Sequence, residues 1–412
     1  MPAANPMPSV QVVHWPAMRR SSERIICSHA GTLPRPADLQ QLMAGGAEKA
    51  AEFQKRLPSA VIDIVDRQIK AGVDVVNDGE LGKVGGFSGY VRDRMSGVRG
   101  GQLKPGQEPH NVNKRDSLEF PGAYEVYRAN TRRRQEARLG RATGVATGQG
   151  WDTYFCVEPL KYVGAETVAS DIRILKEAVK GKDVEPYLPA VAPGTIEHWL
   201  WNDCYKSDEE FLFAIADVMH DEYRAITDAG IVLQIDDPDL PDGWQMYPDM
   251  SMTDYRKYAE LRVDALNHAL RDCPQNLVRF HTCWGSQHTP HKNDIPLGDI
   301  VDLVLKVKAE CYSLEAANPV HEADVHVWET VKLPEGKSYM PGVVGHCTDL
   351  IEHPRLIADR LIAYAKLMGK ENVIGGTDCG IGSRVSHGEI AWAKLESMAE
   401  GARLATKELW RR

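Results

Sequence analysis

Two residues in the second half of the chain, His281 and Cys283, have the side chains and the spacing of a metal site. They lie in an apolar run, 277–283, that reads as a strand, and side chains two residues apart on a strand point to the same face. Cys379 follows a later apolar run among glycines, and Glu315 ends the run between them. One imidazole, two thiolates and a carboxylate suit tetrahedral zinc. Spacing alone leaves open a buried histidine with inert, buried cysteines.

The elements that would position these residues form a recurring unit: a short apolar run, a polar or glycine-rich turn, and an amphipathic helix. We expect strands at 24–28, 73–77, 187–191, 231–236, 277–283, 310–315, 341–345 and 372–377, and helices at 53–71, 208–229, 254–271, 300–308, 354–368 and 391–404. This alternation predicts an α/β fold with a parallel sheet. Eight strands match a (β/α)8 TIM barrel. An open doubly wound sheet is the alternative, but no glycine-rich dinucleotide turn follows the first strand.

The spacing of the strands also indicates how the chain is divided. Residues 1–22 hold prolines and little periodicity, which predicts an extended N-terminal arm. We expect residues 23–412 to form a single barrel. The interval 81–185 is far longer than a crossover helix, so it predicts a long insertion after the second strand. Within it, the segment WDTYFCVEPLKYVG alternates like a hairpin or an edge strand.

Further polar residues follow the other predicted strands, at the end of the barrel where active sites of this fold lie. They are His29, Thr32, Asp78, Glu80, Asp236, Asp237, His346 and Asp378. This set is too polar for a core. We therefore expect the strand ends to meet in one site.

Composition excludes several classes of function. The formal net charge is -9 and the pI is near 5.9, so the basic footprint of a nucleic-acid-binding protein is absent. No apolar run approaches the ~18 to 20 residues of a membrane helix. No apolar segment follows Arg19 and Arg20, which argues against a secretory signal. The eight cysteines are widely spread, as expected for reduced thiols in the cytoplasm. The oligomeric state stays open, a homo-oligomer included.

Several motifs, taken in order, resemble one known family. They are SHAGTLPRP, DGE, QIDDPDL, HTCWG, SLEAAN, GVVGH with EHP, and GTDCGIG, from about residue 24 to the C-terminus. The chain resembles the catalytic barrel of the cobalamin-independent methionine synthases, a family that includes single-barrel epoxyalkane:coenzyme M transferases. The resemblance implies a TIM barrel. It also implies a Zn²⁺ ion bound by His281, Cys283, Glu315 and Cys379.

The same resemblance implies a zinc-dependent thiol alkyltransferase. A homocysteine-like thiol would be activated as a zinc thiolate and would attack a methyl or alkyl donor. Glu80 and Asp236 would bind the amino group of the thiol substrate. The loop ending at Thr32, where the family usually has serine, would bind its carboxylate, and Asp78 lies beside Glu80 as a further substrate-binding candidate. His346 and Asp236 are the catalytic candidates, although the spacing before His346 is one residue shorter than in the family.

The sequence leaves alternatives open for the identity of the alkyl donor and for the class of reaction. Methionine synthases with a second, N-terminal barrel use it to bind folate, so the expected partners are a small-molecule thiol and a corrinoid, folate or epoxide donor. Opening of an epoxide by coenzyme M is the first alternative, and its sulfonate would need a basic group such as Arg35. A metal-free lyase of the uroporphyrinogen decarboxylase type is the second. Finally, His321 and His326 in the run HEADVH are predicted to lie on a solvated surface.

Overall fold

The core of the protein is a sheet of seven parallel strands, seen in a computed structural model that describes residues 17–139 and 153–411 except 287 and 383. In spatial order the strands are β1 (Val75–Val76), β4 (Glu185–Val191), β6 (Val232–Asp236), β7 (Val278–Thr282), β8 (Cys311–Leu314), β9 (Ser338–Val344) and β10 (Gly376–Thr377). The five strands from β4 to β9 are almost entirely buried. Burial on both faces is typical of parallel sheets covered by helices.

The two edges of this sheet meet at residues 26–28, between β10 and β1. The Ser28 amide donates to the Gly375 carbonyl at 2.9 Å, and the Gly375 amide donates to the Ile26 carbonyl at 2.9 Å. On the other side, the Asp74 amide donates to the Cys27 carbonyl at 2.9 Å. Residues 26–28 therefore take the place of the first barrel strand.

The predicted fold class, an α/β TIM barrel, is confirmed, with differences at its two shortest strands. The first predicted strand, 24–28, is reduced to a single bridge between Cys27 and Gly375, because the Cys27 amide donates to the Asp74 carboxylate instead of to a strand carbonyl. The last predicted strand, 372–377, shrinks to β10, because Asn372 ends a short 3-10 helix (Lys370–Asn372) and Val373 and Gly375 make only isolated bridges.

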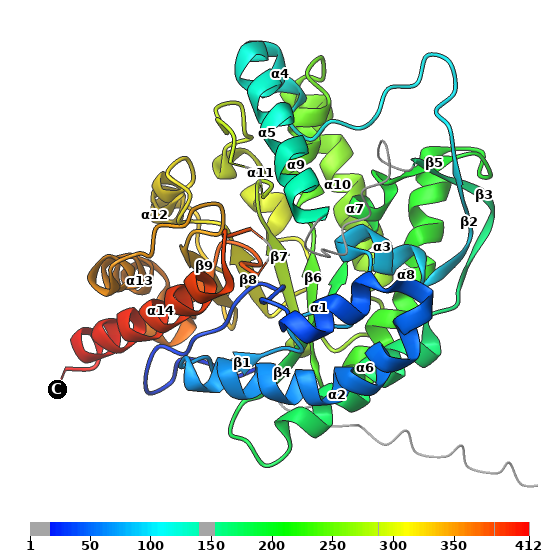
Figure 1. The fold of residues 1–412 in the computed structure, drawn as a ribbon. Coiled ribbons are helices and arrows are strands. Elements are labelled where there is room, and N and C mark those ends of the chain that lie inside the picture. Colours follow the sequence, from blue (N-terminus) through cyan, green and yellow to red (C-terminus); the bar gives the residue numbers. More distant parts are fainter. Residues whose placement is uncertain (1–16, 140–152, 287, 383, 412) are drawn as a thin grey trace, which may run out of the picture.

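Helices cover the outside of the barrel, as Figure 1 shows around the central strands. They include α1 (Ala37–Ala44), α2 (Gly46–Lys70), α6 (Ala165–Val179), α8 (Asp208–Asp228), α10 (Met252–Ala269), α11 (Leu297–Val304), α13 (Pro354–Met368) and α14 (Gly388–Leu409). Helix α8 illustrates why they form where they do. The Ser207 side chain caps its first turn by accepting from the Glu210 amide, and three acidic residues follow it there. Its apolar face then packs into the core.

The segment 81–185 adds a small second sheet beside the barrel. It contains α3 (Gly86–Arg92), β2 (Met95–Gly101), α4 (Lys114–Glu119), α5 (Pro121–Leu139) and β3 (Thr153–Tyr162). The strand expected in this segment is β3, which pairs antiparallel with β2 and parallel with β5 (Leu200–Asn202). Helix α6, at the end of the segment, packs against α2 and α8 in the outer ring of barrel helices.

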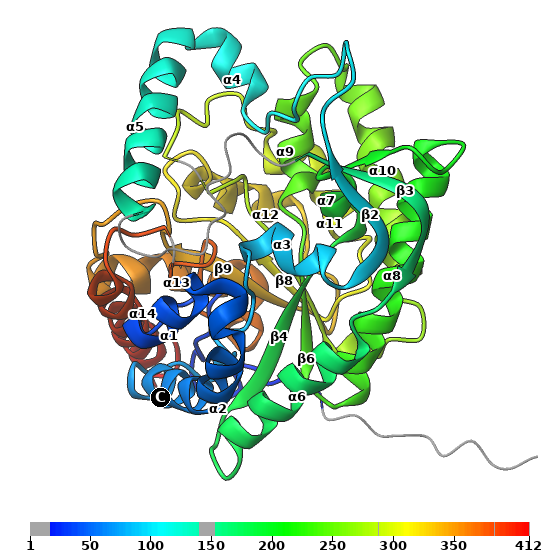
Figure 2. The same ribbon diagram turned by 45° about the vertical axis from the view of Figure 1, so that its right-hand side comes forward.

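Helix α4 connects this segment to the strand-end face of the barrel. The Arg115 guanidinium donates to the carbonyls of Trp244 and Tyr247, near the end of α9 (Asp239–Met246), which follows β6. The Asp116 carboxylate accepts from the Asn293 amide at 2.9 Å, in the loop that follows β7. Figures 1 and 2 both show α4 and α5 projecting above the barrel strands. The insertion thus contacts the loops that carry the candidate chemistry.

The expected N-terminal arm lies mostly outside the described residues, which begin at residue 17. The described part crosses the opposite end of the barrel: the Ser21 hydroxyl donates to the Val373 carbonyl, and the Arg19 amide donates to the Glu185 carboxylate. None of the described helices combines the length and apolar character that crossing a membrane requires.

Candidate metal centre

His281, Cys283 and Cys379 meet at the carboxyl end of the barrel. His281 lies on β7, Cys283 follows that strand, and Cys379 follows β10. One ligand atom from each of the three lies within 4.8 Å of the others. The sequence-based expectation that one strand face would bring the first two together therefore agrees with their positions.

The free nitrogen of His281 is the feature that points to a metal. Its Nδ1 is 3.0 Å from the Ser313 hydroxyl on the neighbouring strand. Among the residues that the structure describes, its buried Nε2 has no hydrogen-bond partner. Buried polar atoms nearly always have partners. A histidine held through one nitrogen, with the other directed to thiols, is the usual arrangement of a zinc ligand and its supporting hydrogen bond.

The two thiols are electrostatically coupled to each other. The hydrogen bond between Cys283 and Cys379, together with burial, raises the pKa of Cys283 well above its ordinary value. The same hydrogen bond lowers the pKa of Cys379 well below that of a free thiol, with His281 contributing in the same direction and burial opposing it. Two sulfur donors and an imidazole nitrogen in one place form a donor set that suits zinc.

Glu315, the fourth predicted ligand, lies in an adjoining group. Its ligand oxygen falls within 4.8 Å of ligand atoms of His346 and Asp378. Its Oε2 accepts from the Trp284 amide at 2.8 Å, immediately after Cys283. The structure therefore places three of the predicted ligands in one cluster. The fourth, Glu315, belongs to a second group with His346 and Asp378.

Asp378 is a site residue that the sequence-based ligand set left out. Its Oδ1 accepts from the amides of Ala316 and Ala317, each at 2.8 Å, so it holds the backbone that follows Glu315. Gly342 on β9 makes room, because a Cβ there would lie 2.1 Å from the same oxygen. The available signal was its position directly before Cys379 at a strand end.

His346, the predicted catalytic histidine, is fully buried at the end of β9. Its Nε2 lies 3.3 Å from the Cys347 sulfur, whereas its Nδ1 has no hydrogen-bond partner. Burial lowers its pKa, although Cys379 and Glu315 oppose the shift. A neutral imidazole beside the thiol cluster is therefore the form expected near neutral pH.

The predicted substrate-binding residues come from the loops after residue 28 and after β1. The Thr32 hydroxyl donates to Glu80 Oε2 at 2.9 Å, and the Glu80 amide donates to Asp78 Oδ1 at 2.9 Å. Gly31 has φ +122° and allows this contact, since a Cβ there would lie 2.7 Å from Glu80 Oε1. Burial raises the pKa of Asp78 to about 6. Three of the four predicted substrate-binding residues are thus joined in one network.

Asp236 reaches the same region from β6, where it pairs in register with His281. Burial raises its pKa to about 7, and the nearby Glu80 carboxylate adds to the increase. Its Oδ1 accepts from Gln234 Nε2 at 2.6 Å, and Gln234 Oε1 in turn accepts from the buried Arg279 at 2.8 Å. Because Arg279 can only donate, it fixes the amide of Gln234 so that its NH2 group faces Asp236.

Arg35 does not neutralise these acids by a direct ion pair. Its guanidinium donates to the carbonyls of Glu80, Leu81 and Lys83, not to a carboxylate. The Lys83 ammonium also acts on Asp236 through space, but it donates to the Pro189 carbonyl, so neither cation forms an ion pair with Glu80 or Asp236 among the described residues.

The expectation of a solvated surface is correct for His326 and wrong for His321. His326 is exposed, but His321 is 2% exposed and stacks on Trp284 with ring centroids 4.0 Å apart. Its two nitrogens lie 2.8 Å from Asp324 and 3.1 Å from Asp294. The polar composition of the run predicted exposure, whereas partners distant in the sequence bury this one histidine.

We expect His321 to make stability depend on pH. Burial lowers its pKa, but the hydrogen bonds to Asp294 and Asp324 outweigh burial and raise the pKa to about 9. A raised pKa means that the stabilisation is fully present below the unfolded value near 6.5 and is lost as pH rises through about 9. The difference in unfolding free energy between the wild-type protein and His321→Gln should therefore shrink by roughly 2 to 3 kcal/mol between pH 6 and pH 10.

The control for this measurement is His326→Gln in the same run. Its imidazole is 72% exposed and pairs with Glu329 at the surface. Urea unfolding of this variant should follow the wild-type pH profile. A His321→Gln difference that is the same at pH 6 and pH 10 would contradict the assigned charge.

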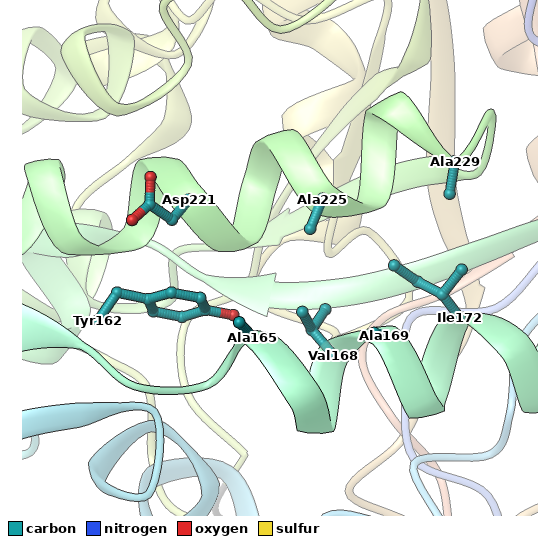
Figure 3. A pocket seen from close by; sticks show the side chains of 8 residues that line it. All are labelled: Tyr162, Ala165, Val168, Ala169, Ile172, Asp221, Ala225 and Ala229. Carbon is teal, nitrogen blue, oxygen red and sulfur yellow. The ribbon is translucent and has the colours of Figure 1, made fainter.

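A separate, mostly apolar groove lies on the outside of the barrel. It is about 430 Å³ in volume and is lined by Tyr162, by α6 residues such as Val168 and Ile172, and by Asp221 and Ala225 of α8. Figure 3 shows these side chains between the two helices. None of the site residues lines it, so the candidate chemistry is not located there.

The sequence of residues 175–404 matches the family model described as the catalytic domain of cobalamin-independent synthase, which is more than half of the chain. The chain belongs to this family. It is 22% identical to a methionine synthase of Thermococcus kodakarensis over 387 residues, covering 92% of this chain and 93% of that protein. It is also 22% identical to a methionine synthase of Saccharolobus solfataricus, covering 93% and 95%.

Two solved structures support the fold of this cobalamin-independent synthase. A B12-independent methionine synthase from a Shewanella species, in complex with selenomethionine, has a TM-score of 0.65 at 19% identity, covering 94% of this chain and 99% of that one. A putative B12-independent methionine synthase from Listeria monocytogenes has a TM-score of 0.63 at 16% identity, covering 94% and 100%. Family membership gives methyl or alkyl transfer to or from small molecules as the chemistry of the chain.

Proposed function

We propose that this protein is a zinc-dependent thiol alkyltransferase that uses an amino-acid thiol of the homocysteine type. The observation that carries the proposal is the buried, unpartnered Nε2 of His281 beside the coupled thiols of Cys283 and Cys379. These three residues would hold the zinc ion, with Glu315 as the fourth ligand. Bound zinc would lower the pKa of the substrate thiol, which is mostly protonated at neutral pH when free.

The acids around the centre support an amino-acid thiol over coenzyme M. Glu80 and Asp236 place two buried carboxylates in one region, and the Glu80 carboxylate adds to the burial that raises the pKa of Asp236. An ammonium group would relieve this repulsion, whereas a sulfonate would increase it. Arg35, the cation that a sulfonate would need, is already bound to backbone carbonyls.

The remaining residues have roles that follow from their contacts. Thr32 and the backbone near Gly31 would hold the substrate carboxylate, while Asp78 supports the loop by accepting from the Glu80 amide. His346, buried beside the thiol cluster, would help to orient the alkyl donor. The unit that we propose to act is residues 23–412, with α4 of the insertion 81–185 contacting the segments that follow β6 and β7. The methionine synthases that this chain matches have similar length, so methyl transfer to homocysteine is compatible with one barrel.

Metal removal tests the proposal directly. The full chain, treated with a chelator and dialysed, should lose thiol consumption in a panel of amino-acid thiols assayed with methyl donors and epoxides. Zinc should restore activity and magnesium should not, because thiolate ligands favour the softer ion. Thiol consumption that survives chelation would contradict the zinc dependence of this function.

A further inference from the structure

A second group of potential ligands lies beside the thiol cluster. Glu315, His346 and Asp378 come from the ends of β8, β9 and β10, and all three are buried. One ligand atom from each lies within 4.8 Å of the other two. The group therefore brings two carboxylates and an imidazole into one small, water-poor volume.

Two polar atoms in this group have no hydrogen-bond partner in the described ranges 17–139 and 153–411, which leave out 287 and 383. They are Oδ2 of Asp378 and Nδ1 of His346, and both residues are 1% exposed. The other oxygen of Asp378 takes two backbone amides, so the carboxylate cannot turn to satisfy both oxygens at once. Leaving a buried polar atom unpaired costs about 1 to 3 kcal/mol, and more for a charged group. Two such atoms in one group indicate a missing ligand.

The charges of the group favour a cation as that ligand. Glu315 and Asp378 carry no ion pair within the described part of the chain. Arg360 influences Asp378 electrostatically, but its guanidinium donates to Glu322 and to the Val343 carbonyl. Buried charges are otherwise paired or bound to metals. Carboxylate oxygens and an imidazole nitrogen are common ligands of divalent first-row metals.

We propose that Glu315, His346 and Asp378 form a second divalent-cation site next to the thiol site. It would differ from the first in having oxygen and nitrogen ligands and no sulfur. The proposal rests on the proposed function only where Glu315 is shared by both sites. The existence of the second site depends on His346 and Asp378 as its ligands.

Cobalt titration of the metal-depleted full chain separates the two sites. Cobalt bound to thiolates shows sulfur-to-metal charge-transfer absorption, whereas cobalt bound to oxygen and nitrogen does not. The wild-type protein should bind a first equivalent with this absorption and a second without it. Asp378→Asn should lose the second equivalent and keep the first. Asparagine retains an acceptor for the amides of Ala316 and Ala317, so the backbone should stay in place.

Two further variants make the result decisive. His346→Gln should lose the second equivalent as Asp378→Asn does, whereas Asp237→Asn should keep both. Asp237 is also a buried strand-end acid, but its Oδ1 accepts from Thr195 and it lies outside the group. Circular dichroism checks that each variant folds.

A wild-type protein that binds only one equivalent would overturn the second site, and so would two equivalents retained in both variants. If the charge-transfer band is absent but an Asp378-dependent equivalent remains, the second site stands and the zinc–thiol function fails.

Discussion

Replacing Cys283 by alanine is expected to remove the metal of the thiol site and to reduce thiol alkylation by at least about 100-fold, since even residues that only support metal ligands contribute 10- to 100-fold. Cys283 is buried, shares a hydrogen bond with Cys379, and lies within 4.8 Å of the ligand atoms of the cluster. Its loss leaves His281 and Cys379 without a second sulfur donor. Metal content per chain and the rate of thiol consumption are the two measurements.

Cys311→Ala is the matched control. Cys311 is also a fully buried free thiol of the barrel, but it begins β8, at the opposite end of the strands. The control should lose a little stability through its small cavity and should keep its metal. Equal metal content in the two variants would exclude Cys283 as a ligand.

Glu80→Gln is expected to weaken the binding of amino-acid thiols selectively. Glutamine keeps an acceptor for the Thr32 hydroxyl and suits the positive φ of 55° at this position as well as glutamate does. It loses the charge that would pair with the ammonium group. A hydrogen bond to a charged group contributes about 1.5 to 3 kcal/mol, which corresponds to a rise in KM of roughly 10- to 150-fold.

The comparison of substrates gives this prediction its control. A thiol with the same chain but no amino group should show little change in KM between the wild-type protein and Glu80→Gln. Glu185→Gln should leave both thiols unaffected, because Glu185 begins β4 at the other end of the barrel and accepts from the Arg19 amide. A uniform loss for both thiols with Glu80→Gln would instead indicate that Glu80 only supports the loop.

The local pattern of the sequence was sufficient for the fold and for part of the centre. Apolar runs alternating with amphipathic helices predicted the barrel, because a parallel strand buried on both faces has few polar residues and its crossover helix has one apolar side. The spacing of His281 and Cys283 predicted their shared strand face. Short strands were the least predictable elements: residues 26–28 close the barrel through backbone hydrogen bonds to both neighbouring segments without forming a regular strand.

The tertiary structure decided how the strand-end residues are grouped. The sequence placed Glu315 among the ligands because it ends a predicted strand and matches a family ligand. In the structure, Glu315 forms a group with His346 and Asp378, which follow other strands. Composition also made His321 a surface residue, although Trp284, Asp294 and Asp324 bury it.

By itself, then, the sequence determined the alternation of strands and helices, the strand face that His281 and Cys283 share, and the donor types available at the strand ends. Only the folded chain decided which nitrogen and oxygen atoms of these side chains have hydrogen-bond partners and which have none among the described residues. The Nε2 of His281 and the Oδ2 of Asp378 are free because Ser313, Ala316 and Ala317 occupy the neighbouring atoms. The physical reason is the distance along the sequence over which each kind of interaction acts. Strand and helix periodicity is encoded within a few residues, whereas hydrogen bonds between strands depend on distances that only the closed barrel sets.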